Sequence, residues 1–109
     1  TPAKTVNYET LVQELYYVQH GNKRLEGQIS ALIIAYFSIP KSASKRKRQA
    51  MLDGQIRPTK KPDWDNIGKI ICDSLNKLAY DDDSGIVDGT VKKYYSDNPR
   101  VEVYLTEAS

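Results

Sequence analysis

Cysteine and histidine are almost absent from this sequence of 109 residues, which has one of each, Cys72 and His20. A single cysteine excludes an internal disulfide framework and a zinc site built on cysteines. It fits a reducing compartment, and we therefore expect a cytoplasmic protein. The sequence also lacks a run apolar enough to span a membrane as a helix, and its first residues show no signal-peptide pattern. We expect no membrane partner.

The residues that are present suit one small globular domain over positions 1–109. Apolar residues make up 39% of the chain, which is ordinary for a folded protein. The net charge is only +2, but the charges are segregated along the chain. A basic segment of this kind either is a solvated connection or grips a phosphate backbone. The candidate DNA-binding residues are Lys41, Lys45, Arg46, Lys47, Arg48, Arg57, Lys60 and Lys61.

Hydrophobic periodicity gives the expected elements. Apolar residues at helical spacing predict two long helices, and a run with Leu32 and Ile34 predicts a central strand. The second helix has one apolar stripe that should dock on the sheet, formed by Ile67, Ile70, Ile71, Leu75 and Leu78. The turn cluster 96–99 between two alternating segments predicts an antiparallel hairpin. The fold class is therefore α+β, a small mixed or antiparallel sheet packed by helices. The expected bounds are helices at about 4–20 and 65–78, a central strand at about 28–37, and hairpin strands at about 86–95 and 100–106, with a short basic helix ending near Leu52.

Aspartates gather at both ends of the second long helix. Asp63 and Asp65 stand at its start, and 81–83 follow its end. Carboxylates this close favour a hard cation such as Mg²⁺, which prefers oxygen ligands. Lys69, one turn beyond Asp65, could neutralise charge on a reacting phosphate. The alternatives are a helix cap for the first pair, a solvated turn for the second group, and an ion pair within the helix for Lys69.

The same stretch resembles a known family. The segments KPDWDNIGKIICDSLNKLAYDDDSGIV, VKKYY and PRVEVYL are similar, in that order, to the RusA family of Holliday-junction resolvases of bacteria and their phages. The similarity covers about residues 57–106, and the opening TPAKT extends it more weakly. Three departures stand out. The extra Asp81 makes the acidic run three residues long, so Asp82, the weaker candidate, and Asp83 could exchange roles. Gly85 occupies a position where the family usually has Gln, and nothing before Thr1 supplies the strand and basic loop that open most members.

The resemblance implies a homodimeric, Mg²⁺-dependent endonuclease that cuts four-way junction DNA by paired nicks, with Mn²⁺ as a possible substitute. It implies that Asp63, Asp65 and Asp83 hold the metal and that Lys69 is the catalytic lysine. The hypothesis is therefore a bacterial or phage-encoded resolvase that acts in recombination and repair. The alternatives are a DNA-binding module without catalysis and a nuclease for flaps or single strands.

Overall fold

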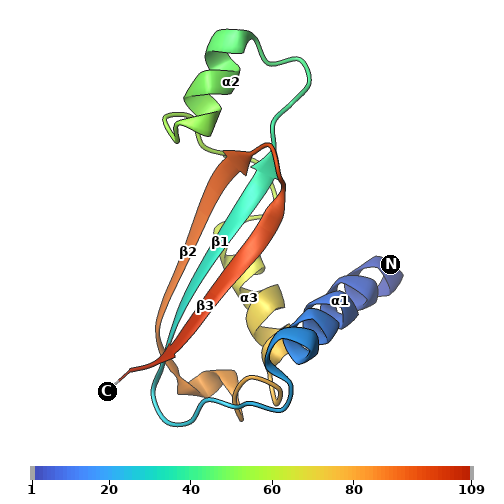
Figure 1. The fold of residues 1–109 in the computed structure, drawn as a ribbon, viewed down its shortest axis with the longest axis vertical. Helices are drawn as coiled ribbons and strands as arrows, with labels where there is room; N and C mark the ends of the chain where they lie inside the picture. The colour runs from blue at the N-terminus through green and yellow to red at the C-terminus, as the bar shows by residue number, and fades with distance from the viewer. Residues whose placement is uncertain (1, 109) are drawn as a thin grey trace.

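A computed structural model describes residues 2–108 of the chain, and the side chains of residues 10–108. Over that range, helices and a three-stranded mixed sheet form a small α+β fold, as predicted (Figure 1). In chain order the elements are α1 (Pro2–His20), β1 (Ile29–Ser38), α2 (Lys45–Leu52), α3 (Trp64–Leu75), the short 3-10 helix η1 (Asp83–Gly85), β2 (Ile86–Ser96) and β3 (Arg100–Glu107).

The strand order is β2-β1-β3, with β1 parallel to β2 and antiparallel to β3. The predicted hairpin is therefore wrong, although both of its strands exist. β1 lies between β2 and β3 because it is apolar at consecutive positions and belongs in the centre, where both of its edges are paired. The turn at 96–99 reverses the chain without pairing the strands that it joins. α2 and α3 lie within the crossover that a parallel connection from β1 to β2 requires.

Alternate residues of β1 build the core. Ile29, Ala31, Ile33 and Ala35 are buried on the face that α3 covers. From α3, Ile67, Ile71 and Leu75 meet them, which confirms the predicted stripe at these three positions. The predicted stripe also held Ile70 and Leu78, which are only partly buried. Burial of this stripe, rather than helix propensity, fixes the axis of α3 on the sheet.

α3 comes especially close to β2 at Gly68. A Cβ atom at this position would lie 3.3 Å from a methyl group of Val91, so a larger residue would require Val91 to shift by a few tenths of an ångström. The helix also ends at Leu75, three residues before the predicted end at 78. Asn76 leaves the helix with ψ 130°, and Lys77 has a left-handed φ of 67°. The chain therefore turns away sharply at this point.

The other face of the sheet carries a row of stacked side chains. The rings of Tyr36 and Tyr94 are 6.2 Å apart, centroid to centroid. The guanidinium of Arg57 lies 4.2 Å from the Tyr94 ring centre, and that of Arg100 lies 4.0 Å from the Tyr36 ring centre. This cation–π row crosses the sheet near α2 and covers part of the face that has no helix.

Candidate active site

The N-terminal end of α3 presents two exposed aspartates. Asp63 is the N-cap residue, and Asp65 lies in the first turn. Within the described part of the chain, the Asp63 side chain caps no helix N–H, whereas its backbone carbonyl accepts from Ile67 at 3.0 Å. Among the described residues, the Asp65 carboxylate accepts only from the neighbouring amide of Asn66, also at 3.0 Å. The capping alternative therefore fails for Asp63, and most of the oxygen lone pairs at this end face solvent.

Lys69 lies one turn further along α3, and its side chain is exposed. None of the ion pairs formed by residues 10–108 involves it, so the expected alternative of an Asp65–Lys69 or Lys69–Asp73 bridge is not present. A spacing of four residues puts Lys69 on the same side of the helix as Asp65. Asp65 and Lys69 therefore share one exposed side of the helix near its N-terminus, where the helix dipole also favours negative charge, and Asp63 is exposed just before them.

Asp83 lies at the opposite end of α3. Its backbone N–H donates to the side-chain oxygen of Asn76 at 3.0 Å, just past the last helical turn. The 12 residues of α3 span about 18 Å at 1.5 Å per residue. Among the described residues, no three Asp, Glu, His or Cys side chains lie close enough to hold a metal ion. The three-aspartate metal site stays a prediction, and one chain does not assemble it.

The C-terminal end of α3 is closed and hydrogen-bonded. The hydroxyl of Tyr80, a residue that is only 1% exposed, donates to the carbonyl of Cys72 at 2.7 Å. Burial raises the pKa of Tyr80, and it also raises the pKa of the Cys72 thiol. The negative charge of Asp83 adds to both shifts. The pKa of the exposed Asp82 carboxyl is shifted in the opposite direction. A hydrogen bond from the Ser84 hydroxyl lowers it.

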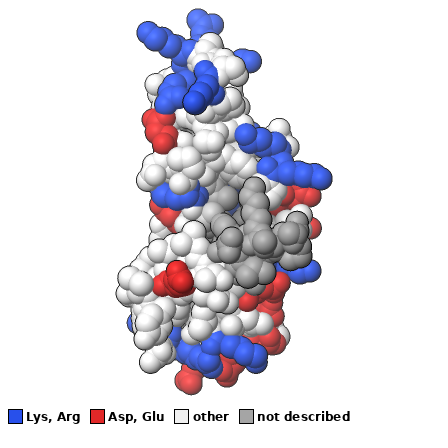
Figure 2. Space-filling view, turned by 90° about the vertical axis from the view of Figure 1, so that its right-hand side faces the viewer, with Lys and Arg blue, Asp and Glu red and all other residues white. Residues whose placement is uncertain are grey.

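The predicted DNA-binding residues lie on α2 and on the loops before and after it. α2 projects beyond the sheet, and Figure 2 shows Lys and Arg side chains gathered at that end of the molecule. Ser44 starts α2 by accepting from the amide of Lys47 at 3.2 Å. Arg48 pairs with Asp97, which ties α2 to the end of β2. All eight predicted residues are exposed: Lys41, Lys45, Arg46, Lys47, Arg48, Arg57, Lys60 and Lys61.

Lys93 is a residue that the sequence interpretation missed. Its ammonium group donates to the carbonyl of Lys60 at 2.6 Å, and its own carbonyl accepts from Arg57 at 2.9 Å. The signal in the sequence was available, because Lys93 lies in phase with Val91 on the strand and so points to the apolar face. A lysine on the buried face of a strand is rare unless its ammonium group has a hydrogen-bonding or charged partner.

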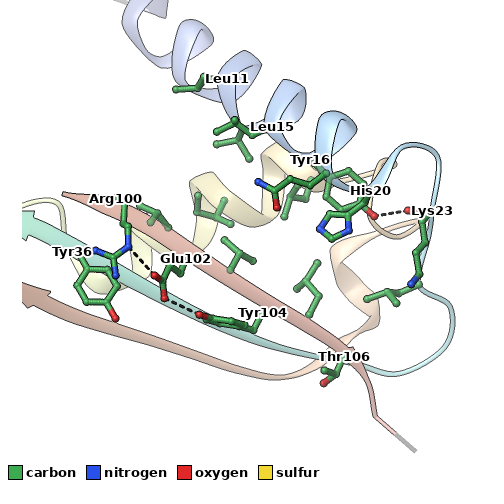
Figure 3. A pocket seen from close by; sticks show the side chains of 18 residues that line it. Leu11, Leu15, Tyr16, His20, Lys23, Tyr36, Arg100, Glu102, Tyr104 and Thr106 are labelled. Atoms are coloured by element: carbon green, nitrogen blue, oxygen red, sulfur yellow. Dashed lines mark hydrogen bonds and ion pairs between the residues drawn. The ribbon is translucent and has the colours of Figure 1, made fainter. Parts of the chain in front are cut away.

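A groove of about 920 Å³ runs between α1 and β3 (Figure 3). Its walls are largely apolar, with Leu11 and Leu15 from the helix and Val103 and Leu105 from the strand. Along its rim Glu102 accepts from Tyr104 at 2.8 Å and from Arg100 at 2.7 Å. Both hydrogen bonds lower the pKa of Glu102, and the bond from Tyr104 has the larger effect. None of Asp63, Asp65, Lys69 and Asp83 lines the groove, so it is not part of the candidate site.

Two comparisons with known proteins cover nearly the whole chain. The family model described as endodeoxyribonuclease RusA matches residues 1–106. The uncharacterised protein YqaN of Bacillus subtilis (strain 168) is 40% identical over 110 residues, which span 99% of this chain and 78% of that relative. Across the described helices, none is long and apolar enough to cross a membrane. The family match includes both ends of α3 and all of the sheet except Glu107.

Proposed function

Since the chain belongs to the RusA endodeoxyribonuclease family, whose membership implies Holliday-junction resolvase activity, we propose that it is a Mg²⁺-dependent endonuclease that resolves four-way DNA junctions by paired nicks. The observation that carries this proposal is the open carboxylate pair Asp63 and Asp65 at the N-terminus of α3. We place the enzyme in recombination and repair in the bacterial cytoplasm, encoded by the bacterium or by a phage or prophage.

The donor set of the pair suits a hard cation. Mg²⁺ is typically held by one or two carboxylates, while water and phosphate oxygens complete its shell. Asp63 offers such oxygens without a side-chain cap bond, and Asp65 offers them beside its one bond from the Asn66 amide. Mn²⁺ accepts the same ligands. Bound there, the metal would supply an activated water and polarise the phosphate. Asp83 does not fit as a third ligand from the same chain, because α3 separates it from the pair.

The reaction is hydrolysis of a phosphodiester. Water adds to phosphorus and the bond from phosphorus to the 3′ oxygen breaks, which leaves a 5′ phosphate and a 3′ hydroxyl. Negative charge grows on the phosphate oxygens during this step. Lys69 is exposed beside Asp65 and carries no ion pair within the described chain, so its ammonium is free to stabilise that charge.

A homodimer would match the two-fold symmetry of a four-way junction and present one site to each of two symmetric strands. It would also explain the separation of Asp83 from the other two aspartates. If the α3 helices of two copies lie antiparallel, Asp83 of one copy comes beside Asp63 and Asp65 of the other. The proposed metal site is then shared between two chains.

Mixing two inactive variants tests the shared site. Asp65→Asn and Asp83→Asn should each be inactive alone, and exchange of their subunits should restore nicking, because each mixed dimer has one undamaged site. If each site lies within one chain, every site in the mixed dimer carries a substitution and activity stays absent. Sedimentation of both variants checks that they still form dimers.

The basic residues on α2 and the following loop are the proposed grip on the DNA backbone. Phosphate contacts bind with little sequence preference and weaken with salt. Replacing Lys45, Arg46 and Lys47 with Gln should remove about three phosphate contacts. The slope of the logarithm of the junction-binding constant against the logarithm of salt concentration should then become shallower by about 0.9 per contact. Equal slopes for the triple variant and the wild type would show that α2 is not part of the DNA-binding surface.

The direct test is nicking of a synthetic four-way junction with and without Mg²⁺. Asp65→Asn should lower the rate by about a hundredfold or more while junction binding persists. The matched control is Asp88→Asn, which changes an exposed aspartate on β2 and should cut normally. Binding without any metal-dependent cutting or metal-dependent rise in Tm would favour the non-catalytic module. Faster cutting of flaps or single strands than of junctions would favour the second alternative.

A further inference from the structure

The loop that leads to Asp63 wraps around the outer edge of β2. Lys93 pairs in register with Ala35, which is buried, so the Lys93 side chain lies on the face covered by α3. Tyr94 pairs with Tyr36 and lies on the opposite face. Arg57 stacks on Tyr94, while the carbonyl of Lys60 meets Lys93. Between residues 57 and 60, the loop therefore passes from one face of the sheet to the other.

Lys93 holds this crossing with both its backbone and its side chain. Its carbonyl accepts from the Nε of Arg57 at 2.9 Å, and its ammonium donates to the carbonyl of Lys60 at 2.6 Å. The ammonium also lies 5.1 Å from the centre of the Phe37 ring, within the range of a cation–π contact. The Lys93 residue is half-buried, and a charge-assisted bond in such surroundings is stronger than one at the open surface.

The aspartate pair has few constraints of its own. Asp63 and Asp65 are exposed, and the side-chain contact found among the described residues is the local bond from Asn66 to Asp65. Lys60 precedes Asp63 by one short stretch of loop, so the position of its carbonyl sets where that stretch enters α3. We propose that Lys93 is a positioning residue that fixes the Asp63–Asp65 pair by clamping the loop before α3. This inference rests on the proposed function of that pair.

The neighbouring lysine gives the contrast. Lys92 pairs with Ile34, is exposed, and lies on the face opposite to Lys93. A lysine that contacts DNA phosphates needs an ammonium group that is exposed to solvent. The ammonium of Lys93 is instead turned inward onto a backbone carbonyl. Its contribution to catalysis is therefore through the loop rather than through the substrate.

Three variants separate these roles. Lys93→Met keeps an apolar chain over Phe37 but removes the donor, Lys93→Arg restores a charged donor, and Lys92→Met is the matched control. We expect Lys93→Met to lower kcat for junction nicking by about tenfold or more, as displaced catalytic groups do, and to raise the Mg²⁺ concentration needed for half-maximal rate. Junction Kd should change by less than about twofold. Lys93→Arg should recover most of the rate, and Lys92→Met should match the wild type in kcat.

A second readout needs no activity. Hydrogen exchange of the amides from 60 to 67 should be faster by about tenfold in Lys93→Met, since local opening follows the lost bond, and near the wild type in Lys93→Arg. If Lys93→Met fails to fold, Lys93→Gln, which keeps a neutral donor, takes its place. Unchanged exchange and kcat, or a loss of affinity with unchanged exchange, would overturn the clamp. Should the wild type cut no DNA, the proposed function falls, while the exchange result still decides the role of Lys93.

Discussion

The two ends of α3 carry the same residue type in opposite surroundings. At the N-terminal end, Asp63 and Asp65 are exposed and make few contacts. At the C-terminal end, Ser74, Leu75 and Tyr80 are almost fully buried. There the amide of Asp83 is bound by the side chain of Asn76. The helix is thus anchored at one end and open at the other.

This difference separates stability from chemistry along one helix. Burial of apolar surface and satisfied hydrogen bonds at the C-terminal end fix the helix against the sheet. The first residues at the N-terminal end, 63–66, are exposed, so the carboxylates of Asp63 and Asp65 remain available to a ligand. Changes at the C-terminal end should therefore affect folding first, and changes at the N-terminal end should affect activity first.

The largest stability effect is expected for Ile71→Ala. Ile71 is 2% exposed and packs in the core next to Leu75. Removing a buried aliphatic side chain costs about 2–5 kcal/mol through lost burial and the cavity left behind. Urea unfolding followed by circular dichroism measures this cost. The fraction that remains folded should cut junctions at the wild-type rate, and a selective loss of kcat would break the separation between the two ends.

Tyr80→Phe should have a smaller effect that depends on pH. At pH 7 the variant loses the bond to the Cys72 carbonyl, which costs about 1 kcal/mol. The pKa of Tyr80 is raised by folding, so its stabilising contribution is complete below the pKa of an unfolded tyrosine, about 10, and is lost as the pH rises above it. Between pH 7 and pH 11, the urea midpoint of Tyr80→Phe should therefore fall by less than the urea midpoint of the wild type.

The N-cap residues of α2 and α3 allow the open end of α3 to be compared with an ordinary helix start. Ser44 caps α2 through its side chain, whereas Asp63 caps α3 without a side-chain bond in the described structure. Ser44→Ala should destabilise α2 by about 1 kcal/mol, and Asp63→Ala should change α3 by about 0.3 kcal/mol through the helix dipole. Amide exchange within each helix measures both. Equal costs would mean that the Asp63 carboxylate does cap α3 in solution.

The smallest effect is expected at Asp82. The hydrogen bond from Ser84 lowers its folded-state pKa, so the contribution to stability is present above the unfolded value of about 3.9 and is lost as the pH falls through the folded value. Asp82→Asn should therefore unfold at a slightly lower urea concentration than the wild type at pH 7. The two midpoints should converge near pH 2, and a gap that persists there would exclude this carboxyl as its source.

Periodicity was enough to locate the helices and strands, because the apolar phase of each element is local. Ile67 and Ile71 marked the buried side of α3, and Leu32 and Ile34 marked a central strand. The strand order was not accessible in the same way. The turn at 96–99 has the local chemistry of a hairpin, and only the need to pair both edges of β1 separates β2 from β3.

The site was predictable in its residues and not in its geometry. The spacing of Asp63 and Asp65 and the family resemblance pointed to the open end of α3. The position of Asp83 depends on where the helix stops, and that is decided by Asn76 and Lys77 together with the burial of Tyr80. The clamp at Lys93 depends on a loop that crosses a strand far away in the sequence, so no local pattern revealed its partner.

The crossing of the loop over β2 also has a consequence for self-association. An uncovered strand edge presents free N–H and C=O groups that recruit other chains into a sheet. At β2, the segment from Arg57 to Lys60 blocks that route near Lys93. Along β3, the described part of the chain places no strand against the outer edge. A strand from another chain could therefore add to the sheet at β3. Loss of the Lys93 clamp would also expose the edge of β2 and favour aggregation.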